Sequence, residues 1–121
     1  MPYYNNWIKE ESMSFAIQIS DLCEKIDGCS VYVNQAMLSS SLIGVNIRMA
    51  KSTPNKTDII QKYEEALDQC VSTEYWIDIL YKKGKISEED YKSVRTKSIL
   101  IRRKLLTVIN ASKKSPSIQK K

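Results

Sequence analysis

The sequence predicts a single-domain, all-α protein built as an up-down-up-down bundle of four helices. Three observations support this fold: apolar residues recur at steps of three and four in four long segments, the links between segments are short, and only three Gly and three Pro occur in 121 residues. We expect residues 1–112 to form the bundle. Residues 113–121 are polar and contain Pro116, so we expect a disordered basic tail there.

The first helix is expected over roughly residues 7–27, with Gly28 just past its end. Asn5 or Asn6 would be its N-cap, because a side-chain oxygen at that position accepts hydrogen bonds from the free N–H groups of the first turn. The stripe that faces the core comprises Ile8, Ser12, Phe15, Ile19, Leu22, Cys23 and Ile26.

The second helix, expected over roughly residues 31–51, contains most of a run of 20 residues without charge between Asp27 and Arg48. The run is long enough for a membrane span, but its many Ser, Asn and Gln side chains would be costly in hydrocarbon. A cleaved signal is excluded because an acidic helix precedes the run. We therefore expect a helix that protein covers on more than one side. The face expected to point inward comprises Tyr32, Gln35, Ala36, Ser39, Leu42, Ile43, Asn46 and Met49. A second strip comprises Val33, Met37, Ser40, Ser41, Gly44 and Ile47.

This second strip predicts that the chain forms a homo-oligomer. Small residues let another helix approach closely, and an exposed apolar strip marks an interface. Trp76 is a further candidate interface residue, since it lies off the main stripe of its helix and Trp is common in binding hot spots. The alternative is a monomer in which the strip is modest and Trp76 is partly buried by ordinary packing.

The third and fourth helices carry clear signals at their ends. The third would be capped by Thr57 or Asp58 and would end at 82–84, where two lysines precede a glycine. The fourth would begin after Ser87 as N-cap, with three acidic residues in its first turn, and would run to about residue 112.

The composition excludes several kinds of site. Without histidine, the chain has no Ser-His-Asp or Cys-His catalysis and no His-ligated metal. Its three cysteines, Cys23, Cys29 and Cys70, are odd in number and form no C-x-x-C pair, so we expect reduced thiols in a cytoplasmic protein. No nucleophile–base pair, phosphate-binding loop or metal cluster is visible, and we expect no enzyme activity, cofactor or metal.

The net charge of +5 is unevenly divided along the chain. Residues 1–90 carry nine Lys or Arg against fourteen acidic residues, whereas residues 91–121 carry ten Lys or Arg and no acid. The candidate nucleic-acid-binding residues are Lys92, Arg95, Arg102, Arg103, Lys113 and Lys114. Phosphate backbones favour such a stripe through counterion release. The alternative is a solvated face, or ion pairing with acidic surfaces of neighbouring subunits.

One acidic residue, Glu74, falls inside the apolar stripe of the third helix. A buried carboxylate needs a partner, because an unpaired one costs several kcal/mol or shifts its pKa. We expect Glu74 and Asn46 to be buried polar residues. Glu74 is either part of a hydrogen-bonded pair that fixes helix register or, with Asn46 as neighbour, part of an inward polar site with a function. A di-iron site is rejected because such bundles use Glu-x-x-His motifs.

Several short pieces resemble a known family. They are "GKISEEDYKSV" at 84–94, the Asn46-Ile47 pair, the Ala66-Leu67 pair and Glu74. In these pieces, and over about residues 13–112, the chain resembles the bacterial four-helix bundle proteins encoded in intervening sequences of 23S ribosomal RNA. That family is related to the accessory protein of diversity-generating retroelements. The resemblance implies a ring-like homopentamer.

Two functions from different classes stay open. The resemblance implies an oligomeric accessory protein that binds nucleic acid, with RNA or DNA and a reverse transcriptase as partners. The chain departs from the family by having Met37 and Leu38 where basic residues are usual, so the basic face of the second helix is missing. The alternative is a protein-interaction scaffold without a nucleic-acid partner. Neither function involves a membrane.

Overall fold

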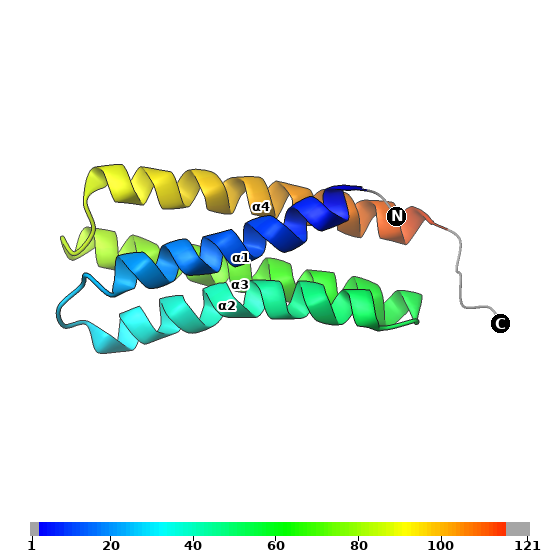
Figure 1. The fold of residues 1–121 in the computed structure, drawn as a ribbon, viewed down its shortest axis with the longest axis horizontal. Coiled ribbons are helices and arrows are strands. Elements are labelled where there is room, and N and C mark those ends of the chain that lie inside the picture. The colour runs from blue at the N-terminus through cyan, green and yellow to red at the C-terminus, as the bar shows by residue number, and fades with distance from the viewer. Residues whose placement is uncertain (1–2, 116–121) are drawn as a thin grey trace.

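The computed structural model describes residues 3–115, with side chains from Asn6 onward. Its four helices are α1 (Tyr3–Cys23), α2 (Ser30–Ser52), α3 (Lys56–Lys82) and α4 (Glu88–Lys114) (Figure 1). They alternate in direction, and each packs on two others: α1 on α2, α2 on α3, α3 on α4, and α4 on α1. The predicted all-α, four-helix architecture is confirmed, and no strand occurs in the described part of the chain.

Capping side chains explain where two of the helices begin. Asn55 caps α3, because its Oδ1 accepts the N–H groups of Thr57 at 2.9 Å and Asp58 at 3.2 Å. The predicted caps, Thr57 and Asp58, are therefore two and three residues too late. Ser87 caps α4 as predicted, with its Oγ accepting an N–H group three residues on. Gly84 follows the end of α3 at φ 76°, the left-handed conformation common after a helix.

The first helix is displaced from its predicted range. Asn5 and Asn6 lie inside α1, so neither is its N-cap. The helix ends at Cys23, four residues early, because the following backbone hydrogen bonds tighten to i→i+3. The chain then reverses through Gly28 and Cys29, which both have positive φ, at 78° and 55°.

The C-terminal helix is longer than predicted. α4 continues to Lys114, so the first two residues of the expected tail are helical. Lys113 and Lys114 form a cationic last turn, which suits the negative end of the helix dipole. The rest of the tail prediction, 116–121, lies outside the described residues.

The core combines large apolar side chains with small residues between α2 and α3. The largest side chains with under 2% exposure include Phe15, Ile19, Ile43, Ile77, Ile101 and Leu105. The α2–α3 interface is the most extensive in the bundle. Ser39 Oγ and Thr73 Oγ1 are hydrogen-bonded across it at 2.7 Å, with both residues buried, and this bond fixes the register of the two helices.

The second strip of α2 is covered within the chain, which corrects the predicted oligomer interface. Ser40 and Ile47 are 0% and 1% exposed, and a Cβ on Gly44 would lie 3.3 Å from Oγ of Ser12 in α1. The remaining members are half-buried, except for one exposed serine: Val33, Met37 and Ser41. The apolar character of the strip arises because α2 has two neighbouring helices in the bundle, and α1 is the second.

The inward face of α2 was predicted only in part. Ala36, Ile43 and Asn46 are buried, whereas Gln35 and Met49 are exposed to solvent. The inward face is thus rotated toward α1. Although α2 contains most of the charge-free run, none of the described helices is long and apolar enough to cross a membrane.

Candidate functional site

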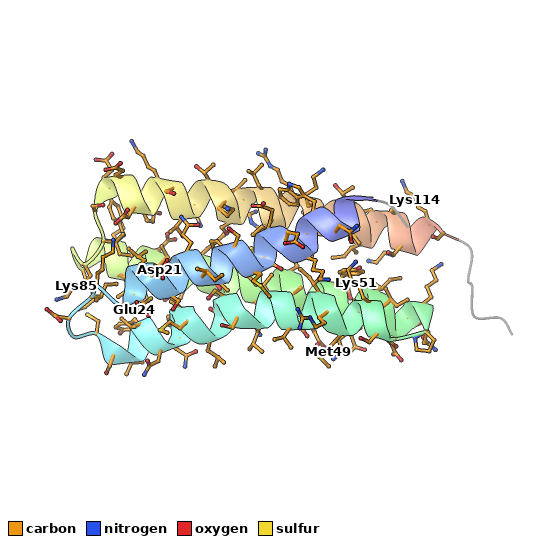
Figure 2. All side chains as sticks on the ribbon, viewed as in Figure 1. Asp21, Glu24, Met49, Lys51, Lys85 and Lys114 are labelled. Atoms are coloured by element: carbon orange, nitrogen blue, oxygen red, sulfur yellow. The ribbon has the colours of Figure 1, made fainter. Side chains whose placement is uncertain are left out.

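More of the exposed apolar side chains lie on α1 and α2 than on α3 and α4. Of ten such side chains among the described residues, six lie on α1 and α2. These six are between 44% and 66% exposed: Met13, Ile17, Val31, Leu38, Val45 and Met49. The four on α2 recur at steps of seven and four, so they form one line on its outer face, with Met49 at the outer edge in Figure 2. An exposed apolar line of this kind is a candidate interaction site.

A groove of about 270 Å³ lies between α1 and α2 beside this line, and we call it the α1–α2 groove. Its apolar lining is Met13, Ala16, Val45 and Met49, and its small residues are Ser12, Ser41 and Gly44. The groove exists because these small residues carry little side-chain volume where the two helices meet. An apolar side chain of another molecule would find both contact area and depth here.

The same groove is cationic at one end. Lys9 and Arg48 line it, and Lys51 lies near Lys9. Burial, and secondly the positive charge of Lys9, lower the pKa of Lys51. Within the described residues none of these three cations forms an ion pair. An apolar groove with unpaired cations at its end is complementary to a partner that carries both apolar and acidic side chains.

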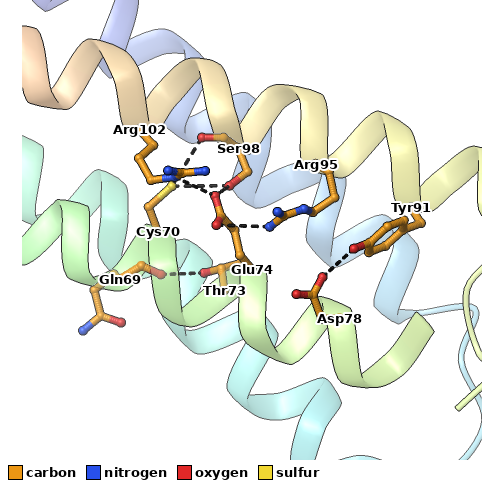
Figure 3. Close-up of polar contacts among 9 residues, drawn as sticks. All are labelled: Gln69, Cys70, Thr73, Glu74, Asp78, Tyr91, Arg95, Ser98 and Arg102. Atoms are coloured by element: carbon orange, nitrogen blue, oxygen red, sulfur yellow. Dashed lines mark hydrogen bonds and ion pairs between the residues drawn. The ribbon is translucent and has the colours of Figure 1, made fainter. Parts of the chain in front are cut away.

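Between α3 and α4, in contrast, the cations are paired, because a buried acid accepts hydrogen bonds from two arginines (Figure 3). Glu74 is 9% exposed. Its Oε1 accepts from Arg95 Nη1 at 3.1 Å, and its Oε2 accepts from Arg102 Nε at 3.1 Å. The hydroxyl of Ser98 also donates to Oε2. We call these four residues with Cys70 the α3–α4 seam.

The groups around Glu74 are bonded in ways that favour a structural role. Burial raises the pKa of the Cys70 thiol to about 11, so at neutral pH it is protonated, and its sulfur lies 3.5 Å from Ser98 Oγ. Further along, Tyr91 donates to Asp78 Oδ1 at 2.7 Å, and this hydrogen bond raises the pKa of Tyr91. In the described part of the chain no three His, Cys, Asp or Glu side chains lie together as a metal site would require.

The six predicted nucleic-acid-binding residues are not one surface. Arg95 and Arg102 belong to the α3–α4 seam, with side chains only 27% and 34% exposed. Two others form exposed ion pairs, Lys92 with Glu88 at 3.1 Å and Lys113 with Glu64 at 3.3 Å. The remaining two are exposed, with no ion pair in the described residues: Arg103 and Lys114. Nucleic-acid binding by these residues stays a prediction.

The other predicted site residues lie apart from one another. Asn46 is buried at 8% exposure, but its amide donates to the Leu42 carbonyl within α2 at 2.9 Å, so it is not a partner of Glu74. Trp76 is half-buried, with its ring 6.1 Å from Tyr32 of α2 and 5.3 Å from Tyr75. It therefore packs across the α2–α3 interface of its own chain.

Fold and surfaces together place this chain in the class of antiparallel four-helix bundle proteins. Residues 5–107 match the model of the 23S rRNA-intervening sequence protein family, and the chain belongs to that family. It is also similar to the crystal structure of a protein with unknown function from the S23 ribosomal protein family of Bacteroides thetaiotaomicron VPI-5482. The two are 31% identical with a TM-score of 0.83, and the match covers 88% of this chain and 97% of that one. No curated protein matches the sequence.

Proposed function

We propose that this protein is a non-enzymatic, cytoplasmic assembly module that works as a homo-oligomer. The observation that carries the proposal is the outer apolar line of α2 beside the α1–α2 groove. Leu38 and Val45 are 55% and 47% exposed there, although the chain has a buried apolar core of its own. Apolar side chains that are exposed to water are stabilised when a second protein surface covers them. By family resemblance the assembly is a ring-like homopentamer.

The proposal is tested by replacing this apolar surface with charge. We expect the wild type to elute as an oligomer at micromolar concentration in size-exclusion chromatography with light scattering. The double variant Leu38→Lys and Val45→Lys should be monomeric and still helical, because both side chains face solvent in the single chain. Leu106→Lys on α4 is the matched control, since Leu106 is 43% exposed on another face, and it should leave the oligomer intact. A wild type that is only monomeric would overturn the proposal.

Binding of nucleic acid is a second candidate, supported by the ten cations and no acid after residue 90. Arg103 and Lys114 are the exposed cations of α4 best placed to contact phosphate, because neither has an acidic partner in the described residues. RNA or DNA would be the ligand, and by resemblance to the retroelement accessory protein a reverse transcriptase would be a further partner. Such binding would be independent of base sequence and would weaken steeply with salt.

Fluorescence anisotropy with labelled RNA and DNA at increasing salt tests this second candidate. Replacing both Arg103 and Lys114 with Gln should flatten the slope of log K against log salt by about 0.9 for each lost phosphate contact on duplex DNA. Absence of binding by the wild type at about 50 mM salt, where nonspecific electrostatic attraction is strong, would rule it out and leave the assembly proposal standing.

A further inference from the structure

We infer that the α1–α2 groove of one copy receives the outer ridge of α3 from a second copy, so that each chain carries both halves of the contact. The ridge comprises Asp68, Val71 and Tyr75. This inference rests on the proposed self-association and adds which two surfaces meet.

The ridge carries large apolar side chains and an acid, which complement the apolar and cationic lining of the groove. Val71 and Tyr75 are 51% and 60% exposed, and they are the large apolar side chains that α3 presents to solvent in the described chain. Asp68 is exposed one turn before Val71 and forms no ion pair with any described residue. A tyrosine supplies a large, rigid contact area, and an acid would face the unpaired cations of the groove.

The two surfaces are also matched in height along the bundle. The Ser39–Thr73 hydrogen bond places these two residues at one level on antiparallel helices. Arg48 lies nine residues after Ser39, and Glu64 lies nine residues before Thr73, so both are about 14 Å from that level and on the same side of it. The cationic end of the groove therefore lies at the height of an acidic part of α3.

The apolar parts correspond in the same way. Ser41, which lines the groove, is two residues after Ser39, and Val71 is two residues before Thr73, so they lie at the same height. Leu38, on the outer line beside the groove, and Tyr75 are within about 2 Å in height. Two copies that stand side by side with parallel axes thus bring apolar surface to apolar surface and the acid Asp68 toward Arg48. Asp68 and Arg48 differ in height by about four residues, or about 6 Å, which is within the combined reach of an arginine and an aspartate side chain.

The contact is heterologous, because the groove and the ridge are different surfaces on different helices. One copy can use its groove toward one neighbour and its ridge toward another without overlap. Head-to-tail contacts of this kind close into rings when the rotation between copies permits it. A symmetric dimer would instead bury the same surface of both copies.

Charge reversal separates this contact from other modes of assembly. Arg48→Glu and Asp68→Arg each place like charges across the contact, and we expect each variant alone to associate at least tenfold more weakly than the wild type. A chain that carries both reversals restores opposite charges and should regain association. Both positions are exposed in the single chain, so circular dichroism and melting temperature should be close to wild type.

Mixing the two single variants is the sharpest form of the test. The groove of Arg48→Glu fits the ridge of Asp68→Arg, and the groove of Asp68→Arg still fits the ridge of Arg48→Glu. Two chains with different affinity tags should therefore co-purify when mixed, although each associates weakly alone. Arg103→Glu is the matched control, since it makes the same charge change on the exposed face of α4.

The outcomes distinguish this inference from the proposed function. If the wild type is a monomer, the proposed function fails and the contact fails with it. If the wild type is an oligomer but the single reversals associate normally, or if their mixture does not recover association, self-association stands and the groove–ridge contact is wrong. If Arg48→Glu weakens association and Asp68→Arg does not, the groove binds a surface other than the α3 ridge, and the inference is wrong.

Discussion

The α3–α4 seam and the α1–α2 groove both hold cations beside small side chains, but only the seam holds a buried acid. Glu74 accepts hydrogen bonds from Arg95 and Arg102, so these guanidinium groups are part of the packing between two helices. Lys9 and Arg48 at the groove have no such acid within the described residues. A cation on a helix is therefore available to a partner only if the neighbouring helix does not already supply its counter-charge.

The largest expected effect comes from removing the acid of the seam. Glu74→Ala leaves two arginines without their shared carboxylate and Ser98 without its acceptor, and we expect the free energy of unfolding to fall by about 3 kcal/mol. Urea denaturation followed by circular dichroism measures this. Glu64→Ala is the control, because the Glu64–Lys113 pair is about half exposed and such pairs contribute little. Equal losses in the two variants would show that the seam is not a special source of stability.

The sequence predicted the fold because local signals agree with the global arrangement. Ser87 and Gly84 occupy the cap and C′ positions that their side-chain chemistry favours, and the helical periodicity of α3 and α4 reflects their buried stripes. What the sequence could not show was which neighbour covers which face. The second strip of α2 was assigned to another subunit, yet Ser40 and Ile47 are buried within the single chain, and Gly44 lies close to Ser12 of α1.

The seam also escaped prediction, although a signal for it was present. Arg95 and Arg102 are seven residues apart, and each follows a residue of the core stripe, Val94 or Ile101. That spacing places both at the edge of the buried face, near enough to reach across to an acid on the next helix. The sequence-based prediction placed Arg95, Arg102 and Arg103 on one cationic face of α4. The position of each residue around the helix axis instead decides which of these cations face α3.

The second largest effect is expected at the contact between Gly44, in the second strip of α2, and Ser12 of α1. Gly44→Leu forces a large side chain toward Ser12, whose Oγ would lie 3.3 Å from the first added carbon, and α1 would have to shift. We expect a loss of about 2 kcal/mol in the free energy of unfolding, typical of overpacking between helices. Gly44→Ala should be much milder, since the gain in helix propensity of about 1 kcal/mol offsets the single close contact. Equal stability of the Leu variant and the wild type would mean that α1 and α2 are less closely packed than the structure shows.

The smallest effect distinguishes two arginines that are adjacent in sequence. Arg102→Gln removes one of the hydrogen bonds to Glu74, but Arg95 and Ser98 remain, so we expect a loss of only about 1 kcal/mol in the free energy of unfolding. Arg103→Gln should change stability by less than about 0.5 kcal/mol, because the Arg103 side chain is exposed. Nucleic-acid binding, if the second candidate function holds, should respond in the reverse order, with Arg103→Gln lowering affinity more than Arg102→Gln. Measuring stability and binding on the same two variants therefore separates a cation that stabilises the bundle from one that is free to contact a phosphate. If the same variant shows the larger loss in both measurements, the assignment of separate roles to Arg102 and Arg103 is wrong.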